Sequence, residues 1–176
     1  MPHIDLGNDS PGIRSLFIYR PETAKPIAEM AEILLRGPGS LERWERELIA
    51  THVSSLNECD FCANSHAAVT AAQLPDELNL LTIRADLGAA PISDKLKALL
   101  DIAAAVQQDG RQVTTELVDA ARKAGATDRE VHDAVLIAAA FCMYNRYVDG
   151  LGTLAPSEPA AYAAAAQHIV ANGYRV

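Results

Sequence analysis

The segment 47–66 constrains the fold of this chain more than any other stretch. It reads E-L-I-A-T-H-V-S-S-L-N-E-C-D-F-C-A-N-S-H and carries two of the three cysteines, Cys59 and Cys62, in a C-x-x-C pattern. Residues 60–73 are rich in alanine and contain no glycine or proline, so they predict a helix. Such a helix places Cys59, Cys62 and His66 on one face, because side chains three and four residues apart share a face.

This spacing suits a pair of reactive thiols. Alpha carbons three residues apart in a helix lie about 5 Å from each other, and a disulfide bridge tolerates that distance. The start of a helix also favours the thiolate, the nucleophilic form of cysteine. His66 follows Cys62 by one turn and can accept its proton, and Glu47 on the preceding helix can orient or charge that histidine. We therefore predict that Cys62 is the base-activated thiol and Cys59 its resolving partner.

Two other interpretations of the cysteine pair stay open at this point. Cys59, Cys62 and His66 could supply three ligands to zinc, although four-ligand sites usually draw on a second cysteine pair. The remaining cysteine, Cys142, has no histidine beside it, and its apolar surroundings predict a small buried residue. Alternatively, both cysteines of the pair are unreactive and buried.

The same residues resemble a known family. The pattern is E-x(11)-C-x-x-C-x-x-x-H, preceded by Val53, Ser54 and Asn57. It is similar to the AhpD-like alkylhydroperoxidases of the carboxymuconolactone decarboxylase superfamily. The resemblance implies an all-α, AhpD-like helical bundle whose active site is formed by Glu47, Cys59, Cys62 and His66. It also implies that the second cysteine reacts with peroxide while a glutamate–histidine relay moves the proton.

Two further features refine the resemblance. The segment 145–152, N-R-Y-V-D-G-L-G, and the chain length are similar to the subgroup called peroxidase-related enzymes. AhpD itself has a second histidine immediately before its second cysteine, whereas this chain has Phe61 there. Because of this departure, AhpD's efficiency and its reducing partner are not transferred to this chain, whereas the core chemistry is. Decarboxylases of the superfamily lack the cysteine pair, so decarboxylation is disfavoured.

The length and composition of the chain restrict its domain number, its core, its binding partners and its location. A chain of 176 residues predicts one domain, 1–176, with a redox core at about 40–73. Hydrophobic residues make up 49% and aromatic residues 5%, which predicts a core of alanine, leucine, isoleucine and valine between close-packed helices. The net charge of −8 argues against a basic nucleic-acid-binding surface. The polar start shows no signal peptide, and no stretch is apolar enough to span a membrane, so we expect a cytoplasmic protein.

Periodicity and capping residues predict the elements along the chain. We expect an irregular arm at 1–20, then helices at 21–36, 41–56, 60–73, 76–85, 93–108, 115–124, 127–148 and 159–171. Ser40 and Ser93 are expected to cap the helices that they precede, and Thr127 and Glu130 to form a capping box at the start of the helix at 127–148. Near the end of the helix at 127–148, Asn145, Arg146 and Asp149 predict a structural hydrogen-bond network or subunit contacts. A role for these three residues beside the redox site is the alternative.

The expected function is reduction of small-molecule alkyl hydroperoxides through a dithiol–disulfide cycle of Cys62 and Cys59. An external thiol or dithiol restores the pair, and no metal or organic cofactor is required. An alanine-rich helical surface and the family resemblance together predict a homo-oligomer of three or six subunits. The alternative from another class is a non-enzymatic redox sensor or scaffold that uses the same cysteine pair.

Overall fold

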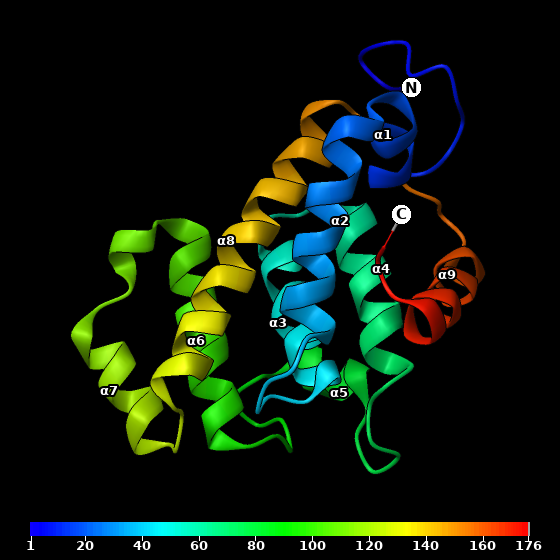
Figure 1. Cartoon of the computed structure of the whole chain (residues 1–176). Coiled ribbons are helices and arrows are strands. Elements are labelled where there is room, and N and C mark those ends of the chain that lie inside the picture. The colour runs from blue at the N-terminus through cyan, green and yellow to red at the C-terminus, as the bar shows by residue number, and fades with distance from the viewer. Residues whose placement is uncertain (176) are drawn as a thin grey trace.

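The computed structural model describes residues 1–175, and within that range the regular elements are all helical (Figure 1). They are α1 (Ile13–Tyr19), α2 (Pro21–Arg36), α3 (Arg43–Leu56), α4 (Asp60–Ala71), α5 (Leu80–Ala85), α6 (Asp94–Gln108), the 3-10 turn η1 (Gly110–Gln112), α7 (Thr115–Lys123), α8 (Asp128–Gly150) and α9 (Pro159–Asn172). The predicted all-α class is confirmed.

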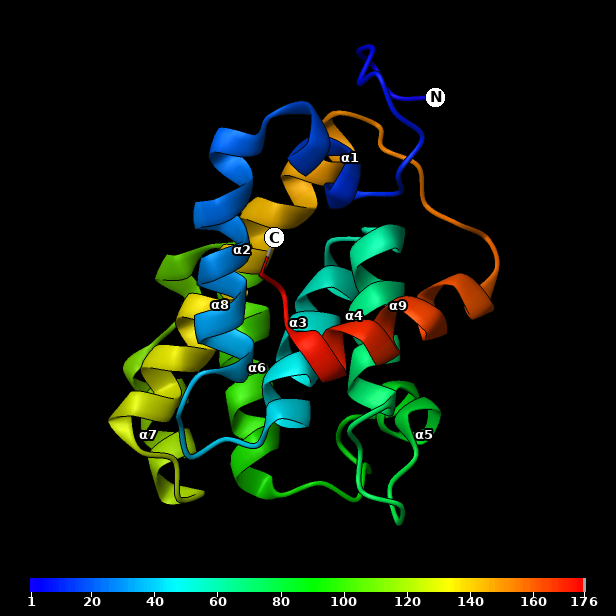
Figure 2. The same cartoon turned by 45° about the vertical axis from the view of Figure 1, so that its right-hand side comes forward.

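The helices that carry the site lie at the centre of the bundle. Helix α3 packs against α4, α6 and α8, while α9 packs along α4 on the outside. Figure 2 shows the chain turning back after α9 so that its C-terminal end approaches α2. The core between these helices is aliphatic, with Leu48, Leu99, Ile102 and Ile137 almost completely buried. Leucine, isoleucine, valine and alanine make up most of the buried core, as the composition predicts, and Phe141 and Tyr144 complete it.

Three predictions about helix ends and loops were wrong. The helix expected at 76–85 begins only at Leu80, after Asn79 as its N-cap. Ser40 does not cap α3; the N-cap is Glu42, which forms a capping box with Glu45. The Ser40 hydroxyl instead donates to Glu130 Oε1 at 2.9 Å, so a tertiary contact takes the group that a cap would have used. The arm at 1–20 is irregular only as far as Gly12, because residues 13–19 form α1. Helix α1 buries Leu16, and its neighbour α2 covers part of it.

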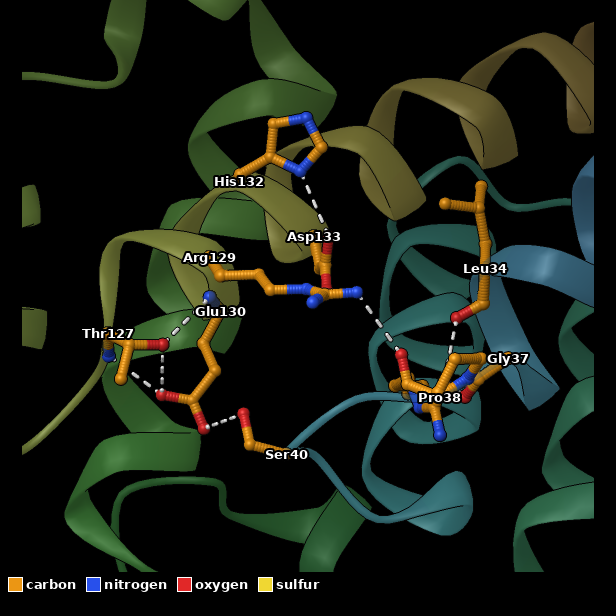
Figure 3. Close-up of polar contacts among 10 residues, drawn as sticks. Leu34, Gly37, Pro38, Ser40, Thr127, Arg129, Glu130, His132 and Asp133 are labelled. Carbon is orange, nitrogen blue, oxygen red and sulfur yellow. Dashed lines mark hydrogen bonds and ion pairs between the residues drawn. The ribbon is translucent and has the colours of Figure 1, made fainter.

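Glu130 ties three helical segments together at the base of the bundle. The capping box predicted at the start of α8 is confirmed, with Thr127 and Glu130 bonded reciprocally. The same buried carboxylate accepts hydrogen bonds from Ser40 ahead of α3 and from Lys95 Nζ on α6, the latter at 2.8 Å. Figure 3 shows Glu130 between Ser40 and Thr127. These contacts fix the beginning of α3, the helix that carries Glu47.

Glu130→Gln is expected to destabilise the fold by about 2 kcal/mol at neutral pH, because a buried charge-assisted network loses its anion. Burial alone would raise the pKa of Glu130, but hydrogen bonds from Lys95, Thr127 and Ser40 outweigh it and hold the pKa at about 2. The carboxylate therefore stabilises the fold above its unfolded pKa of about 4.3, and this contribution is lost as pH falls through about 2. Denaturant unfolding at several pH values measures the effect.

The control for this prediction is Glu77→Gln, which alters an exposed carboxylate in the loop before α5. Wild type and the control should both lose stability as the solution is acidified below about pH 4.3. The Glu130 variant should lose less over the same range. An unchanged acid dependence in that variant contradicts the assignment.

Candidate redox site

A tight turn between α3 and α4 brings the cysteine pair to the start of α4. Asn57 ends α3, Glu58 adopts a left-handed conformation with φ of 56°, and Cys59 is the N-cap of α4. The amide of Cys59 donates to the carbonyl of Ser54 at 3.0 Å, which closes the turn. Cys62 follows in the first turn of α4, as the spacing predicted. Both thiols are free and buried, with Cys59 0% and Cys62 4% exposed.

Glu47 and His66 meet across the interface between α3 and α4. Glu47 Oε2 lies 2.8 Å from His66 Nδ1, and the glutamate side chain is only 1% exposed. A carboxylate is an acceptor only, so the pairing requires that His66 Nδ1 carry the proton and donate it. The other ring nitrogen, Nε2, is then left to exchange a proton with another group. All four residues named from the sequence, Glu47, Cys59, Cys62 and His66, therefore lie in one region of the structure.

The two thiols have different protonation preferences. The hydrogen bond from Cys59, together with the positive potential of His66 and a bond from Asn145, outweighs burial and lowers the pKa of Cys62. The same bond to Cys62, followed by burial, raises the pKa of Cys59. The pair thus favours a single thiolate on Cys62, with Cys59 as its hydrogen-bond donor.

The polar residues near the end of α8 take two different positions. Asn145 is buried; its amide donates to Ser54 Oγ at 3.1 Å, and its Oδ1 accepts from Asn57 at 2.8 Å. Asn145 also helps to lower the pKa of Cys62, and Asp149 helps to raise the pKa of Cys59, so both residues lie beside the cysteine pair. The predicted hydrogen-bond network is present, and the alternative placement beside the redox site also holds for Asn145 and Asp149. Arg146 turns outward and donates to a carbonyl of its own helix.

Cys142 is less buried than predicted. It is partly exposed, and its Sγ accepts a weak hydrogen bond from Asn57 Nδ2 at 3.6 Å. The residue therefore lies beside the network that supports the α3–α4 turn. It belongs to neither of the two cavities near the cysteine pair.

Tyr174 belongs to the site and was not anticipated from the sequence. Its hydroxyl lies 2.7 Å from Glu47 Oε1 and 3.3 Å from His66 Nδ1. Its ring stacks on His66 with centroids 5.9 Å apart and an interplanar angle of 21°. The residue comes from the segment after α9, 127 residues from Glu47 along the chain, so no local pattern signals the contact.

Two neighbouring cavities share part of their lining beside the redox site, and one of them reaches Cys62. The outer cleft has a volume of about 650 Å³ and lies between α1, α4 and α9. The inner pocket measures about 70 Å³ and is largely apolar. Both are lined by Ile13, Phe17, Phe61, His66 and Tyr174. Cys62 lines only the inner pocket, and Cys59 lines neither, so Cys62 is the thiol that faces the cavity.

Phe61 forms part of the wall where the resemblance would place a histidine. Its ring packs against Gly12, which has a φ of +54°, and any Cβ at that glycine would overlap the ring. The glycine before α1 therefore allows the segment 1–12 to approach the site closely. Phe61 makes this part of the cavity apolar, where a histidine would provide a second titratable group.

Two structural features are absent from residues 1–175. No three side chains of histidine, cysteine, aspartate or glutamate in that range are arranged to hold a metal ion. Over the same described part of the chain, no helix has the length and apolar character that a bilayer crossing requires.

The structure is that of an all-α protein in which a cysteine pair and a glutamate–histidine pair lie beside an apolar cavity. Known proteins with the same kind of fold are similar to this chain. Residues 21–93 match the carboxymuconolactone decarboxylase family. The crystal structure of an uncharacterized peroxidase-related protein from Silicibacter sp. TM1040 is similar in fold, with a TM-score of 0.76 and 24% sequence identity. The similarity covers 87% of this chain and 78% of that protein. A comparison with curated proteins finds no match.

A second solved structure, from Ralstonia eutropha, is described as an alkylhydroperoxidase AhpD core and an uncharacterized peroxidase-related protein. It has 26% identity and a TM-score of 0.76, covering 85% of this chain and 78% of its own. The family match over residues 21–93 and the fold shared with both solved structures make this chain similar to the AhpD-like proteins of the carboxymuconolactone decarboxylase superfamily.

Proposed function

We propose that the protein is a thiol-dependent peroxidase that reduces organic hydroperoxides through Cys62 and Cys59. The observation that carries the proposal is the position of Cys62. It is the thiol that faces the inner pocket, its pKa is lowered, and it lies beside the Glu47–His66 pair. A nucleophilic thiol needs these conditions: access to substrate, ionisation and a neighbouring proton carrier.

The proposed cycle balances with a peroxide and two reducing equivalents. The Cys62 thiolate attacks the terminal oxygen of ROOH, the O–O bond breaks, and the alkoxide takes a proton from His66 and leaves as ROH. Cys62 is then a sulfenic acid. The Cys59 sulfur attacks the Cys62 sulfur and loses its proton, and the displaced hydroxide takes up a proton and leaves as water. An external dithiol reduces the resulting disulfide and is itself oxidised to a disulfide.

The cavities favour organic hydroperoxides over hydrogen peroxide. The inner pocket of about 70 Å³ has room for a small peroxide group beside Cys62. The outer cleft of about 650 Å³ is lined mostly by apolar side chains such as Ile13, Phe17 and Ile169, which can hold an alkyl or aryl group. Binding of that group would lower the KM of an organic peroxide relative to hydrogen peroxide.

Steady-state kinetics tests the function. With dithiothreitol in excess, the protein is expected to consume many equivalents of cumene hydroperoxide per chain, with a KM about tenfold lower than for hydrogen peroxide. Burial of an apolar group typically gives a factor of this size. Consumption that stops at one equivalent per chain, with dithiol still present, contradicts the enzyme and indicates a redox sensor.

The proposal includes the assembly and the compartment. A homo-oligomer of three or six subunits would cover part of the alanine-rich helical surface outside the cleft. Light scattering on the purified protein measures this oligomeric state.

A cytoplasmic location would supply the reducing thiols that the cycle consumes.

A further inference from the structure

The segment after α9 is attached to α2 by specific contacts. Arg36 Nη1 donates to the carbonyls of Ile169 and Val170, both at 3.0 Å, at the end of α9. The amide of Tyr174 donates to Glu32 Oε2 at 2.8 Å. Between these contacts, Gly173 has a φ of +86°, and a Cβ there would overlap the Glu32 carboxylate. Glu32 and Arg36 therefore determine where Tyr174 lies.

The Tyr174 hydroxyl completes the hydrogen bonding of Glu47. Glu47 Oε1 accepts from the tyrosine at 2.7 Å, while Oε2 pairs with His66 at 2.8 Å. Each oxygen of this buried carboxylate therefore has its own donor. Burial, and then the negative charge of Glu47, raise the pKa of Tyr174 well above its usual range, so the hydroxyl remains a donor at neutral pH.

From this geometry we infer that Tyr174 is a positioning residue of the redox site, acting on Cys62 through Glu47 and His66. Its hydroxyl holds the Glu47 carboxylate in the orientation that pairs with His66 Nδ1, which leaves His66 Nε2 to serve the thiol. The contacts of Glu32 and Arg36 on α2 hold Tyr174 beside Glu47. The inference rests on the relay of the proposed function, but its test needs no peroxide.

Loss of the hydroxyl would change the titration of Cys62. Without that donor, Oε1 of the buried Glu47 carboxylate has no partner, and the carboxylate is free to turn away from His66 Nδ1. A His66 ring that Glu47 no longer holds in place is a poorer partner for Cys62, so the thiolate loses a favourable neighbour. The pH at which Cys62 ionises should therefore rise.

Several other charged or titratable groups face these residues. Glu32 and Arg36 on α2 face Tyr174, and Cys59 and Asp149 face Cys62. Tyr174→Phe leaves all four in place and keeps the aromatic ring that stacks on His66. A change in Cys62 titration then reports the lost hydroxyl.

The experiment measures alkylation of Cys62 by iodoacetamide across pH, with the modified residue assigned by peptide mass spectrometry. In Tyr174→Phe the alkylation midpoint should rise by about one pH unit, and the rate at neutral pH should fall about tenfold. The matched control is Tyr162→Phe, because Tyr162 also lines the cleft but its hydroxyl donates to the carbonyl of Pro156 at 2.8 Å. The control should titrate as wild type does.

A purely structural role for Tyr174 would lower the thermal midpoint, or slow alkylation equally at every pH, without moving the titration. An unmoved titration in a folded Tyr174→Phe protein overturns the inference, as does an equal shift in the Tyr162 variant. If Tyr174→Phe does not fold, Arg36→Gln replaces it. Releasing the end of α9 should then raise the Cys62 midpoint, and an unchanged midpoint overturns the inference. Absence of peroxide turnover in wild type would count against the proposed function alone.

Discussion

Cys62→Ser is expected to abolish hydroperoxide turnover, lowering the rate by at least about a thousandfold. A serine hydroxyl has neither the nucleophilicity of a thiolate nor a route to a stable sulfenic acid. Cys59→Ser is expected to stop steady-state turnover with dithiol but to retain the first oxidation. In that variant Cys62 still faces the inner pocket and His66 still lies beside it. Stopped-flow peroxide consumption and trapping of the sulfenic acid with dimedone distinguish the two variants.

Cys142→Ser is the matched control for these substitutions. Cys142 is the third free cysteine and lines neither cavity, so its removal should leave turnover unchanged. Equal retention of peroxide consumption in the Cys62 and Cys59 variants would contradict the assignment of roles. A dimedone adduct that forms on Cys59 in wild type would reverse it.

The parts of the fold and site that could be predicted from the sequence are local. Helix periodicity and the proline and glycine residues that interrupt it set the bounds of α2 as predicted, and Ser93 and Thr127 cap α6 and α8 as predicted. The arrangement of Cys59, Cys62 and His66 follows in the same way from one helix. Predicting the position of Glu47 required a second helix, α3. The contact between Glu47 and His66 is still nearly local, because only a short turn separates α3 from α4.

The parts that could not be predicted depend on contacts between distant segments. Tyr174 reaches Glu47 only because Arg36 and Glu32 on α2 bind the end of the chain, and neither residue lies in a recognisable motif. The same reason explains the error at Ser40, whose hydroxyl is used by Glu130 across the bundle. Capping preferences are local averages, and a buried carboxylate that needs a donor can override them.

Glu47→Gln is expected to lower peroxide reduction by about a hundredfold or more with little change in shape, because general acid–base assistance contributes effects of this size. Glutamine has one oxygen and one amino group in place of two equivalent oxygens. Tyr174 would hold the oxygen, since its hydroxyl donates to that side of Glu47 at 2.7 Å. The amino group would then face His66 Nδ1 as a donor. His66 would be forced into the opposite tautomer, with its proton on Nε2, and could no longer accept the proton of Cys62.

The matched control is Glu45→Gln on the same helix, because glutamine can replace glutamate in the capping box that Glu45 forms with Glu42. It should keep wild-type activity. The two variants are compared by kcat/KM for cumene hydroperoxide across pH. In Glu47→Gln the loss should be largest near neutral pH and smaller in alkali, where hydroxide ionises Cys62 without help from His66. A Glu47→Gln protein with wild-type kcat/KM near neutral pH would remove the glutamate–histidine relay from the mechanism, and the lowered pKa of Cys62 would then rest on Cys59 and Asn145.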